Sequence, residues 1–266
     1  MKKSVLPLLF LSCVLAAAPA VQESIIHTMD DKDMKVLTAE ALPDGSIEYT
    51  LPGSGKQKVK IPRGRYLYAW IPKPKEVSEA DVLFDANLPE KAIAAYRAAY
   101  AKYSLLGWDV YCIYRESEAL SMLGQKTEAL AKLDQLKDYK TSNPHLLPHI
   151  ALAKRLNAKL CIELGKFDQA LQVLKEMTSG TDDSAAAFGF MAKGDILKAQ
   201  NKNKEASLMY LQTVLLFRHA PERPEALAKL YSVLQEMKDP NAAKFGEMLK
   251  QEYPDSAFTR KLFGKK

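Results

Sequence analysis

The sequence contains little of several residue types on which small or specialised folds depend. Its 266 residues include three cysteines, two tryptophans and 12 glycines. Three cysteines cannot form the disulfide framework of a small secreted domain, and the low glycine content excludes a collagen-like or low-complexity chain. With 47% hydrophobic and 26% charged residues, the chain has enough apolar material for a globular core. Its length fits one large domain or two small ones.

Long apolar stretches are also scarce, and the clearest one lies at the amino terminus. Lys2 and Lys3 precede an apolar stretch from Val5 to Ala18, and Ala18-Pro19-Ala20 follows. A basic start, a short apolar stretch and small residues predict a secretory signal over residues 1–20, cleaved after Ala20. The stretch is shorter than the roughly 20 residues of a membrane span, so we expect no span and an exported, periplasmic or extracellular protein.

A lipoprotein signal is the alternative interpretation of the same segment. Phe10-Leu11-Ser12-Cys13 partly matches a bacterial lipobox, because a small residue directly precedes the cysteine. In that case Cys13 would carry a lipid anchor. The aromatic Phe10 fits the motif poorly, and apolar residues continue beyond Cys13, so the cleavable signal remains the main prediction.

Charge of one sign is in small excess. There are 38 Lys and Arg residues against 32 Asp and Glu residues, a net charge of +6. Removal of residues 1–20 leaves 36 basic against 32 acidic residues, a net charge of +4. No basic run or aromatic-basic motif is present, so we expect no nucleic-acid partner. The mild excess is compatible with an acidic partner or an anionic envelope polymer.

Patterns typical of catalysis, cofactors or metals are missing from the sequence. It has no nucleophile elbow, phosphate-binding glycine loop, His-Glu-x-x-His motif or paired cysteine motif. His145 and His149 are four residues apart, but Pro148 is expected to begin a helix after His145, so they do not form a metal pair. We therefore predict no catalytic residue, no cofactor and no metal site. An enzyme with a site between a sheet and the helices is a remaining alternative.

After loss of the signal, two cysteines remain. Cys112 and Cys161 both fall within helical patterns, where small apolar residues are expected inside. We predict that both are buried and act as small hydrophobic residues, with a disulfide between them as the alternative.

The sequence pattern of residues 21–72 predicts a small β-strand segment. Asp44-Gly45 lies between Val36–Leu42 and Ser46–Leu51, which is typical of a hairpin turn because glycine adopts positive φ easily. Two further runs, Lys56–Ile61 and Arg65–Ile71, alternate between apolar and polar or aromatic residues. We expect an antiparallel sheet of three or four strands. Such a small sheet should dock on the helical part of the chain to be stable.

An aromatic row in the last of these runs has two interpretations. Tyr66, Tyr68 and Trp70 alternate, so they share one face of a strand. Aromatic rings in a row are typical of a surface that stacks on sugar rings, which suggests binding of a glycan or of peptidoglycan. The main prediction is that the rings cover the first helix of the next domain, because an isolated sheet needs such apolar cover, and glycan stacking is the alternative.

Residues 73–258 contain five helical units in register. Alanines recur at spacings of 37, 41, 36 and 37 residues, and a residue suited to a helix-ending turn lies five positions before each alanine. The alanines are Ala92, Ala129, Ala170, Ala206 and Ala243; the turn residues are Asn87, Gly124, Gly165, Asn201 and Lys238. Each unit is therefore predicted to be a pair of antiparallel helices joined by a short turn.

Small residues on the first helix of each pair support this interpretation. Ala80, Ser117, Ala158 and Gly194 lie twelve residues before the corresponding alanines, where two helices must approach closely. In the fifth unit Tyr231 takes that place, and Glu247 takes a place that is apolar in the other units. A less regular last unit is expected of a terminal repeat, and residues 259–266 are expected to form a basic tail.

The five units together resemble the tetratricopeptide repeat (TPR), a 34-residue unit with Gly or Ala at its eighth position, Ala at its twentieth and often Pro near its end. Glu252-Tyr253-Pro254-Asp255-Ser256 is similar to repeat ends of bacterial envelope members of this family. The units here are longer than 34 residues, and the second is the longest. The resemblance implies a mostly α fold, an α-solenoid of about five helical hairpins with a groove lined by the first helices.

The resemblance also implies which side chains face the groove. They include Tyr111, Tyr114, Arg155, Lys159 and Lys198. Tyrosines and cations together favour a protein or peptide ligand, and the cations favour an acidic one. The predicted function is a non-catalytic scaffold of the bacterial cell envelope, with glycan binding by Tyr66, Tyr68 and Trp70 as the alternative.

Overall fold

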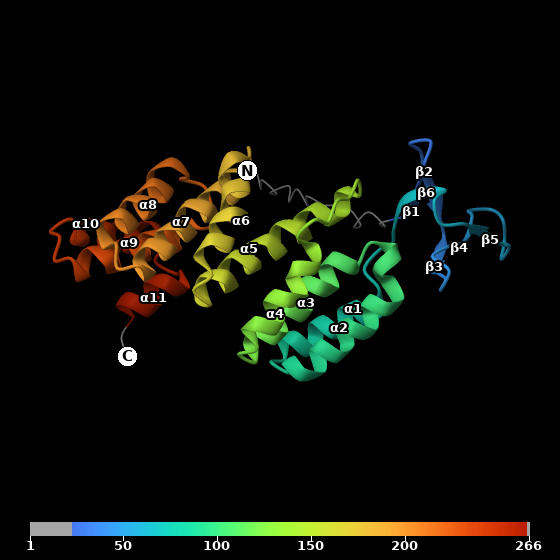
Figure 1. Cartoon of the computed structure of the whole chain (residues 1–266), viewed down its shortest axis with the longest axis horizontal. Coiled ribbons are helices and arrows are strands. Elements are labelled where there is room, and N and C mark those ends of the chain that lie inside the picture. Colours follow the sequence, from blue (N-terminus) through green and yellow to red (C-terminus); the bar gives the residue numbers. More distant parts are fainter. Residues whose placement is uncertain (1–22, 265–266) are drawn as a thin grey trace, which may run out of the picture.

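A computed structural model describes residues 23–264, in which a small β region precedes a stack of helices (Figure 1). The predicted signal segment, including Cys13, lies outside the described residues. Among these residues the fold is mostly α, and antiparallel sheets occur only near the amino-terminal end, as the sequence predicted. The carboxyl-terminal end of the helical stack lies on the opposite side of the molecule from the β region (Figure 1).

The β region contains six strands in two antiparallel sheets. The first sheet has the order β2-β1-β6 and the second has the order β3-β4-β5. Their bounds are β1 (Ser24–Thr28), β2 (Asp33–Val36), β3 (Thr38–Ala41), β4 (Ile47–Thr50), β5 (Lys58–Ile61) and β6 (Tyr66–Trp70). The predicted hairpin is present, and Gly45 has a φ of 78°. The β1–β2 hairpin was missed because its turn has no glycine; Asp31 takes the left-handed conformation, with a φ of 60°.

One bent run of chain joins the two sheets. β2 and β3 follow each other with only Leu37 between them. Val36 pairs with Ser24 of β1, whereas the Leu37 amide donates to the Thr50 carbonyl of β4 at 2.8 Å. Because neighbouring residues of a strand direct their backbone groups to opposite sides, β1 and β4 lie on opposite sides of this run.

After the β region, the described part of the chain forms helices, most of them in consecutive antiparallel pairs. Their bounds are α1 (Lys75–Asp85), α2 (Pro89–Tyr103), α3 (Asp109–Met122), α4 (Lys126–Leu133), α5 (Leu147–Glu163), α6 (Phe167–Ser179), α7 (Asp183–Ala199), α8 (Asn203–Leu216), α9 (Arg223–Glu236), α10 (Ala242–Glu252) and α11 (Ala257–Phe263). Three short 3₁₀ helices are η1 (Ser104–Leu106), η2 (Asp134–Leu136) and η3 (Pro144–Leu146). We call the pairs α1/α2 to α9/α10 repeats 1 to 5.

The turns and alanines predicted from the sequence organise the first four repeats. All five turn residues have positive φ, from 56° at Lys238 to 78° at Gly124. Ala92, Ala129, Ala170 and Ala206 are completely buried. In repeat 4, a Cβ on Gly194 would lie 2.5 Å from the Tyr210 ring, so the two helices approach as closely as a glycine permits.

Repeat 5 departs from the predicted register by one residue. Ala243 is exposed, and Ala242 is buried instead. Asp239 accepts a hydrogen bond from the Asn241 amide at 2.8 Å, and this additional turn delays the start of α10. The sizes of the packed residues are also exchanged, because the large Tyr231 on α9 lies against Gly246 on α10. The irregular sequence of repeat 5 thus preserves close packing with a different arrangement of large and small residues.

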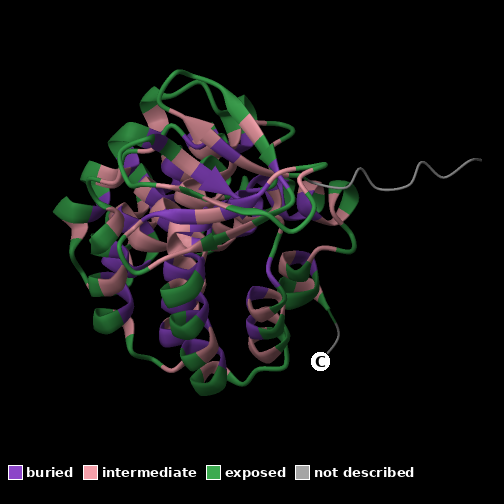
Figure 2. Ribbon diagram, turned by 90° about the vertical axis from the view of Figure 1, so that its right-hand side faces the viewer, coloured by how far each residue is buried: buried purple, intermediate pink, exposed green. Residues whose placement is uncertain are grey.

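The β region is attached to the turn between α2 and α3. The Trp108 indole donates to the Ile71 carbonyl at 3.0 Å. A Cβ on Gly107 would lie 2.9 Å from the Trp70 ring, so glycine is needed there. Seen from this end, buried residues lie in the strands and in the helices behind them, and exposed residues dominate the turns (Figure 2).

The long second repeat has a structural reason. The chain between α4 and α5 reaches the sheet, where the His145 ring stacks on Trp70 with centroids 4.1 Å apart. Asn143 is 1% exposed in the same contact region. The additional residues therefore connect repeat 3 to the β region.

Two further predictions concern the cysteines and the carboxyl terminus. Cys112 and Cys161 are buried and free, as predicted, and the alternative disulfide is not formed. The segment predicted as a basic tail is instead helical up to Phe263, within α11. Ser256 caps this helix by accepting from the Thr259 amide at 3.0 Å, and Phe263 packs against Tyr231 of α9 with ring centroids 5.1 Å apart.

Candidate functional site

The residues predicted to face the groove all lie on first helices of repeats. Tyr111 and Tyr114 lie on α3, Arg155 and Lys159 on α5, and Lys198 on α7. We call the surface formed by α1, α3, α5, α7 and α9 on the side of these residues the first-helix surface. Lys159 is exposed, and the other four side chains are partly buried. The structure therefore places them on successive repeats, but it does not gather them into one pocket.

Arg155 is held by neighbouring residues. It forms an ion pair with Glu222, which is 6% exposed and directly precedes α9. A second nitrogen of the Arg155 guanidinium donates to the Ser184 hydroxyl at 2.8 Å, and the guanidinium lies 5.2 Å from the Phe188 ring centroid. This network connects repeats 3, 4 and 5. Arg155 therefore fixes the relative placement of the repeats, and its charge is already neutralised.

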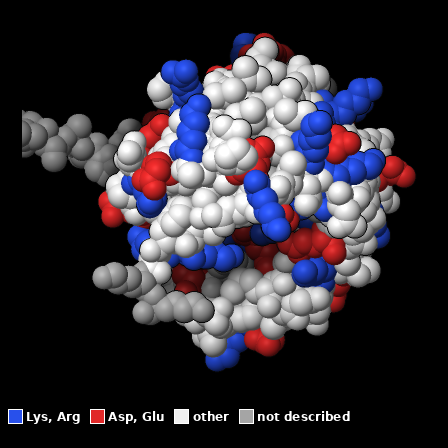
Figure 3. All heavy atoms as spheres, turned by 90° about the vertical axis from the view of Figure 1, so that its left-hand side faces the viewer, with Lys and Arg blue, Asp and Glu red and all other residues white. Residues whose placement is uncertain are grey.

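Lys198 is also paired, whereas Lys159 is not part of any ion pair found among residues 23–264. Lys198 lies 2.6 Å from the Glu236 carboxylate, across from α7 to α9. Both line a depression of about 530 Å³ that Asp195 also borders. Figure 3 views the end with α8 to α11 and shows a hollow in which acidic and basic side chains lie together. Positive charge is thus offset by carboxylates over much of this surface.

A partly buried polar cluster that the sequence prediction missed lies between repeats 1 and 2. The Asp81 carboxylate accepts hydrogen bonds from the hydroxyls of Tyr96 at 2.6 Å and Tyr111 at 2.8 Å, and it also pairs with Lys73. Arg115 of α3 lies 3.5 Å from the same carboxylate and 3.8 Å from the Phe84 ring centroid. Tyr111 is therefore partly committed to holding two first helices together.

The same arrangement recurs between repeats 4 and 5. Asp195 accepts from the Tyr210 hydroxyl at 2.8 Å and pairs with Lys229 at 2.6 Å. In both clusters the tyrosine follows the aspartate by 15 residues and the cation follows it by 34. That repeated spacing is a sequence signal that could have identified the clusters. Each one connects the first helix of a repeat to its own second helix and to the next repeat.

The pKa of Asp81 shows how these contacts balance. Burial raises the pKa of this carboxyl, but hydrogen bonds from Lys73, Tyr96 and Tyr111 outweigh burial, and the pKa lies below its usual value. Burial and the hydrogen bond to Asp81 raise the pKa of both tyrosines. The aspartate therefore stays ionised and the tyrosines stay neutral donors at neutral pH.

The aromatic row does not present three free ring faces. Tyr66 and Trp70 are 7% and 8% exposed. The ring of Tyr68 remains partly exposed but is stacked on His27 with centroids 4.7 Å apart. Two of the three side chains therefore contribute to the core that joins the β region to the helices.

The structure also places His145 and His149, the two histidines considered as a metal pair. His145 lies in η3 and His149 in α5, so the expected helix boundary between them is present. Burial lowers the pKa of both rings. In the part of the chain that the structure covers, no cluster of His, Cys, Asp or Glu is arranged to hold a metal ion. No helix within residues 23–264 has the length and apolar character needed to cross a membrane.

Comparison with known proteins finds similar folds but no match by sequence. No protein-family model matches the chain, and no curated protein matches its sequence. Among solved structures, MamA residues 41–end from Desulfovibrio magneticus RS-1 has a TM-score of 0.50, with 17% identity, covering 69% of this chain and 99% of that one. TTC0263, a TPR protein of Thermus thermophilus, has a TM-score of 0.52, with 16% identity, covering 70% and 93%.

A third structure is PilW, described as a widely conserved type IV pilus biogenesis factor. Its TM-score is 0.53, with 14% identity, covering 70% of this chain and 80% of PilW. The helical region has the tetratricopeptide-repeat fold. At these identities the similarity concerns the TPR fold alone. In this chain the β region precedes the helices.

Proposed function

We propose that this chain is a non-catalytic scaffold of the bacterial cell envelope that binds a partner protein or peptide on the first-helix surface of its TPR region. The observation that carries the proposal is the fixed geometry of that surface. Buried or partly buried carboxylates link the first helices: Asp81 through Tyr111 and Arg115, Glu222 through Arg155, and Asp195 through Lys229. A surface that is rigid before binding loses little conformational entropy when a ligand binds.

Exposed side chains between these fixed contacts are the candidate ligand contacts. Leu152 is 41% exposed and lies on α5 with Lys159, which is also exposed. An apolar anchor beside a cation is suited to a peptide that has an apolar and an acidic residue. A preference for acidic ligands would depend on Lys159, because Glu222 and Glu236 neutralise Arg155 and Lys198.

Site-specific photo-crosslinking in the native cell tests this proposal. We would replace Leu152 or Lys159 with a photoreactive phenylalanine derivative and identify the crosslinked proteins by mass spectrometry. The matched controls are Leu171 and Lys175 on α6, since Leu171 is 40% exposed and Lys175 is also exposed. We expect the same partner from Leu152 and Lys159 but not from α6. Absence of a discrete partner at both first-helix positions, or equal crosslinking from α6, would contradict the proposal.

The charge preference has a separate test. Lys159→Glu should weaken capture of an acidic partner without changing the helical circular dichroism signal. Arg155→Glu is unsuitable, because it would place a second carboxylate beside Glu222 and disturb the fold. Unchanged or stronger capture by Lys159→Glu would exclude the acidic preference while leaving the binding surface itself in place.

Export and the glycan alternative are further parts of the proposal. Residues 1–20 support export, and sequencing the mature amino terminus would distinguish Val21 from a lipid-modified Cys13. For glycan binding, the burial of Tyr66 and Trp70 leaves Tyr68 as the partly exposed ring. If cell-wall material retains the protein and Tyr68→Ala abolishes retention without lowering the melting temperature, the glycan alternative gains support.

A further inference from the structure

The four edge strands of the two sheets differ in how well they are protected against another strand. Charged residues on an edge strand discourage further pairing. β5 carries Lys58 and Lys60, and β2 carries Asp33 and Lys35. β6 is bulky, with three aromatic residues. β3, with the sequence Thr-Ala-Glu-Ala, has one charged residue and two alanines, which allow another chain to approach closely.

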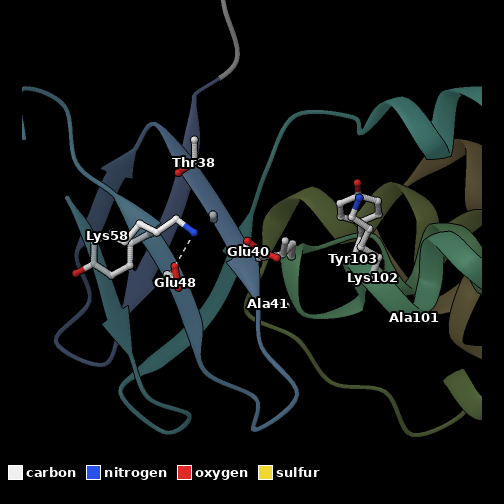
Figure 4. A pocket seen from close by; sticks show the side chains of 11 residues that line it. Thr38, Glu40, Ala41, Glu48, Lys58, Ala101, Lys102 and Tyr103 are labelled. Carbon is white, nitrogen blue, oxygen red and sulfur yellow. Dashed lines mark ion pairs between the residues drawn. The ribbon is translucent and has the colours of Figure 1, made fainter. Parts of the chain in front are cut away.

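A cleft of about 400 Å³ borders β3. One wall contains all four β3 residues, and the other comes from the end of α2 and from η1 (Figure 4). The helical wall consists of Ala101, Lys102, Tyr103 and Leu106. In Figure 4, β4 and β5 lie on the other side of β3, so the free edge of β3 faces the helical wall. The cleft is separate from the first-helix surface.

Backbone groups of β3 are available along this edge. The Leu42 amide donates to the Ser46 carbonyl at 2.8 Å, toward β4. Because backbone direction alternates along a strand, the amides of Ala41 and Ala39 point away from β4 when counted from Leu42. The Leu37 amide also reaches β4, but Thr38 is the register partner of Thr50, so Leu37 lies one residue out of the β3 register and does not set the direction of Ala39 and Ala41. No strand of the described chain pairs with that edge. Four residues of strand give about 13 Å of edge, enough for a short extended segment.

The charges of the cleft indicate the chemistry of an added segment. Glu40 lies directly opposite Glu48 in the strand register, an unfavourable arrangement for like charges. Lys58 compensates Glu48 at 2.8 Å, and Lys102 is paired with Glu76. Among residues 23–264, Glu40 forms no ion pair. A basic residue on a neighbouring strand, opposite Glu40, would complete this row.

We propose that the free edge of β3 binds an extended segment of a partner protein by β-strand addition. The segment alternates apolar and basic residues: its basic residue lies opposite Glu40, and its apolar residues lie beside Ala39 and Ala41, whose cross-strand neighbours are Tyr49 and Ile47. This second binding site uses the β region, so its test is independent of the first-helix surface.

Amide hydrogen exchange measured by NMR on the full chain tests the proposal. The probe is an acetylated, amidated Val-Lys-Val-Lys-Val peptide, and Val-Glu-Val-Glu-Val is the charge control. We expect the Lys peptide to slow exchange at Ala39 and Ala41 by roughly tenfold or more, and the Glu peptide to have little effect. The Glu40 amide, which faces β4, should not change. Glu40→Lys should reverse the peptide preference, whereas Glu90→Lys, an exposed glutamate on α2, should leave it intact.

Three results would overturn the proposal. The first is no change at Ala39 and Ala41 at millimolar Lys peptide. The second is equal protection by both peptides together with no effect of Glu40→Lys. The third is protection of Ala39 and Ala41 in the full chain without peptide that disappears when residues 1–22 are deleted, because the chain's own amino-terminal segment would then occupy the edge.

Discussion

Gly194 shows how strongly one residue determines the approach of two helices. An added Cβ would lie 2.5 Å from the Tyr210 ring, which is completely buried and donates to Asp195. We expect Gly194→Ala to lower the free energy of unfolding by about 1–3 kcal/mol, because the ring must move within a packed core. Urea denaturation would measure the loss.

Two controls separate this packing effect from the general effect of replacing glycine. Gly180→Ala should change stability little, since the nearest atom to its added Cβ is 3.8 Å away. Combining Gly194→Ala with Tyr210→Leu should recover part of the loss, because repeat 3 pairs Ala158 with Leu174 at the same places. If the double variant loses more free energy of unfolding than the two single variants lose together, ring displacement is not the cause.

His27 gives the β1–β2 hairpin a pH-dependent contact. Its ring nitrogens lie 2.7 Å from Asp33 and 3.1 Å from Asp31. The hydrogen bond with Asp33 is the main reason that the pKa of His27 is raised above 6.5, although partial burial opposes it. The imidazolium form therefore stabilises the fold below the unfolded pKa of about 6.5, and this contribution is lost as pH rises through the folded pKa.

His27→Gln should accordingly reduce stability in a pH-dependent way. The difference from the unmodified protein should be largest near about pH 5.5 and should nearly vanish near about pH 8.5. Urea midpoints at both pH values would measure it. A constant difference across this range would show that loss of stacking on Tyr68, and not ionisation, explains the effect.

At the scale of elements, the register of repeat 5 is open to a direct test. Ala242 is buried at 6% exposure and Ala243 is exposed, although the repeat pattern places Ala243 inside. Ala242→Glu should destabilise the protein by about 3 kcal/mol or more, because a charge without a partner enters the core. Ala243→Glu should change stability by less than about 0.5 kcal/mol. Melting temperatures of the two variants would decide; equal losses would contradict the one-residue shift.

The sequence predicted those elements whose causes lie close together along the chain. The turn residues and Ala92, Ala129, Ala170 and Ala206 act within one helical pair, so spacing alone located them. The β1–β2 hairpin lacked a glycine signal, and β1 also depends on pairing with β6, which comes about 40 residues later in the chain. Repeat 5 was assigned the wrong register because the additional turn at Asp239 cannot be recognised from repeat spacing.

Prediction of the candidate site was limited by distance along the chain. The helices and faces of Tyr114 and Lys159 follow from the repeat pattern. Glu222 lies 67 residues after Arg155, so nothing local indicates that it neutralises that cation. The burial of Trp70 likewise depends on Gly107 and His145, which come from other parts of the chain.

At the scale of the whole molecule, the Arg155–Glu222 contact is a long-range restraint. In a simple solenoid each repeat contacts its neighbours, but this ion pair connects repeats 3 and 5. Glu222→Gln should lower the free energy of unfolding by about 1–2 kcal/mol, because Arg155 is 24% exposed and water partly compensates it. It should also increase the radius of gyration in small-angle X-ray scattering.

The matched control for this contact is the more exposed pair of Lys198 and Glu236. These side chains are 37% and 52% exposed, so Glu236→Gln should cost less than about 0.5 kcal/mol. Equal losses from Glu222→Gln and Glu236→Gln, with unchanged scattering, would show that the longer-range pair has no special role in setting curvature.

The stack of His145 on Trp70 has a mechanical consequence. Since the β region touches the α2–α3 turn and also the chain that leads into α5, it braces the joint between the second and third helical pairs. Without the contacts of the β region, repeats 1 and 2 would be linked to repeats 3 to 5 mainly by the packing of α3 and α4 against α5. A fragment starting at Lys73 lacks the β region and should therefore melt in two steps. In the first step, repeats 1 and 2 should separate from repeats 3 to 5.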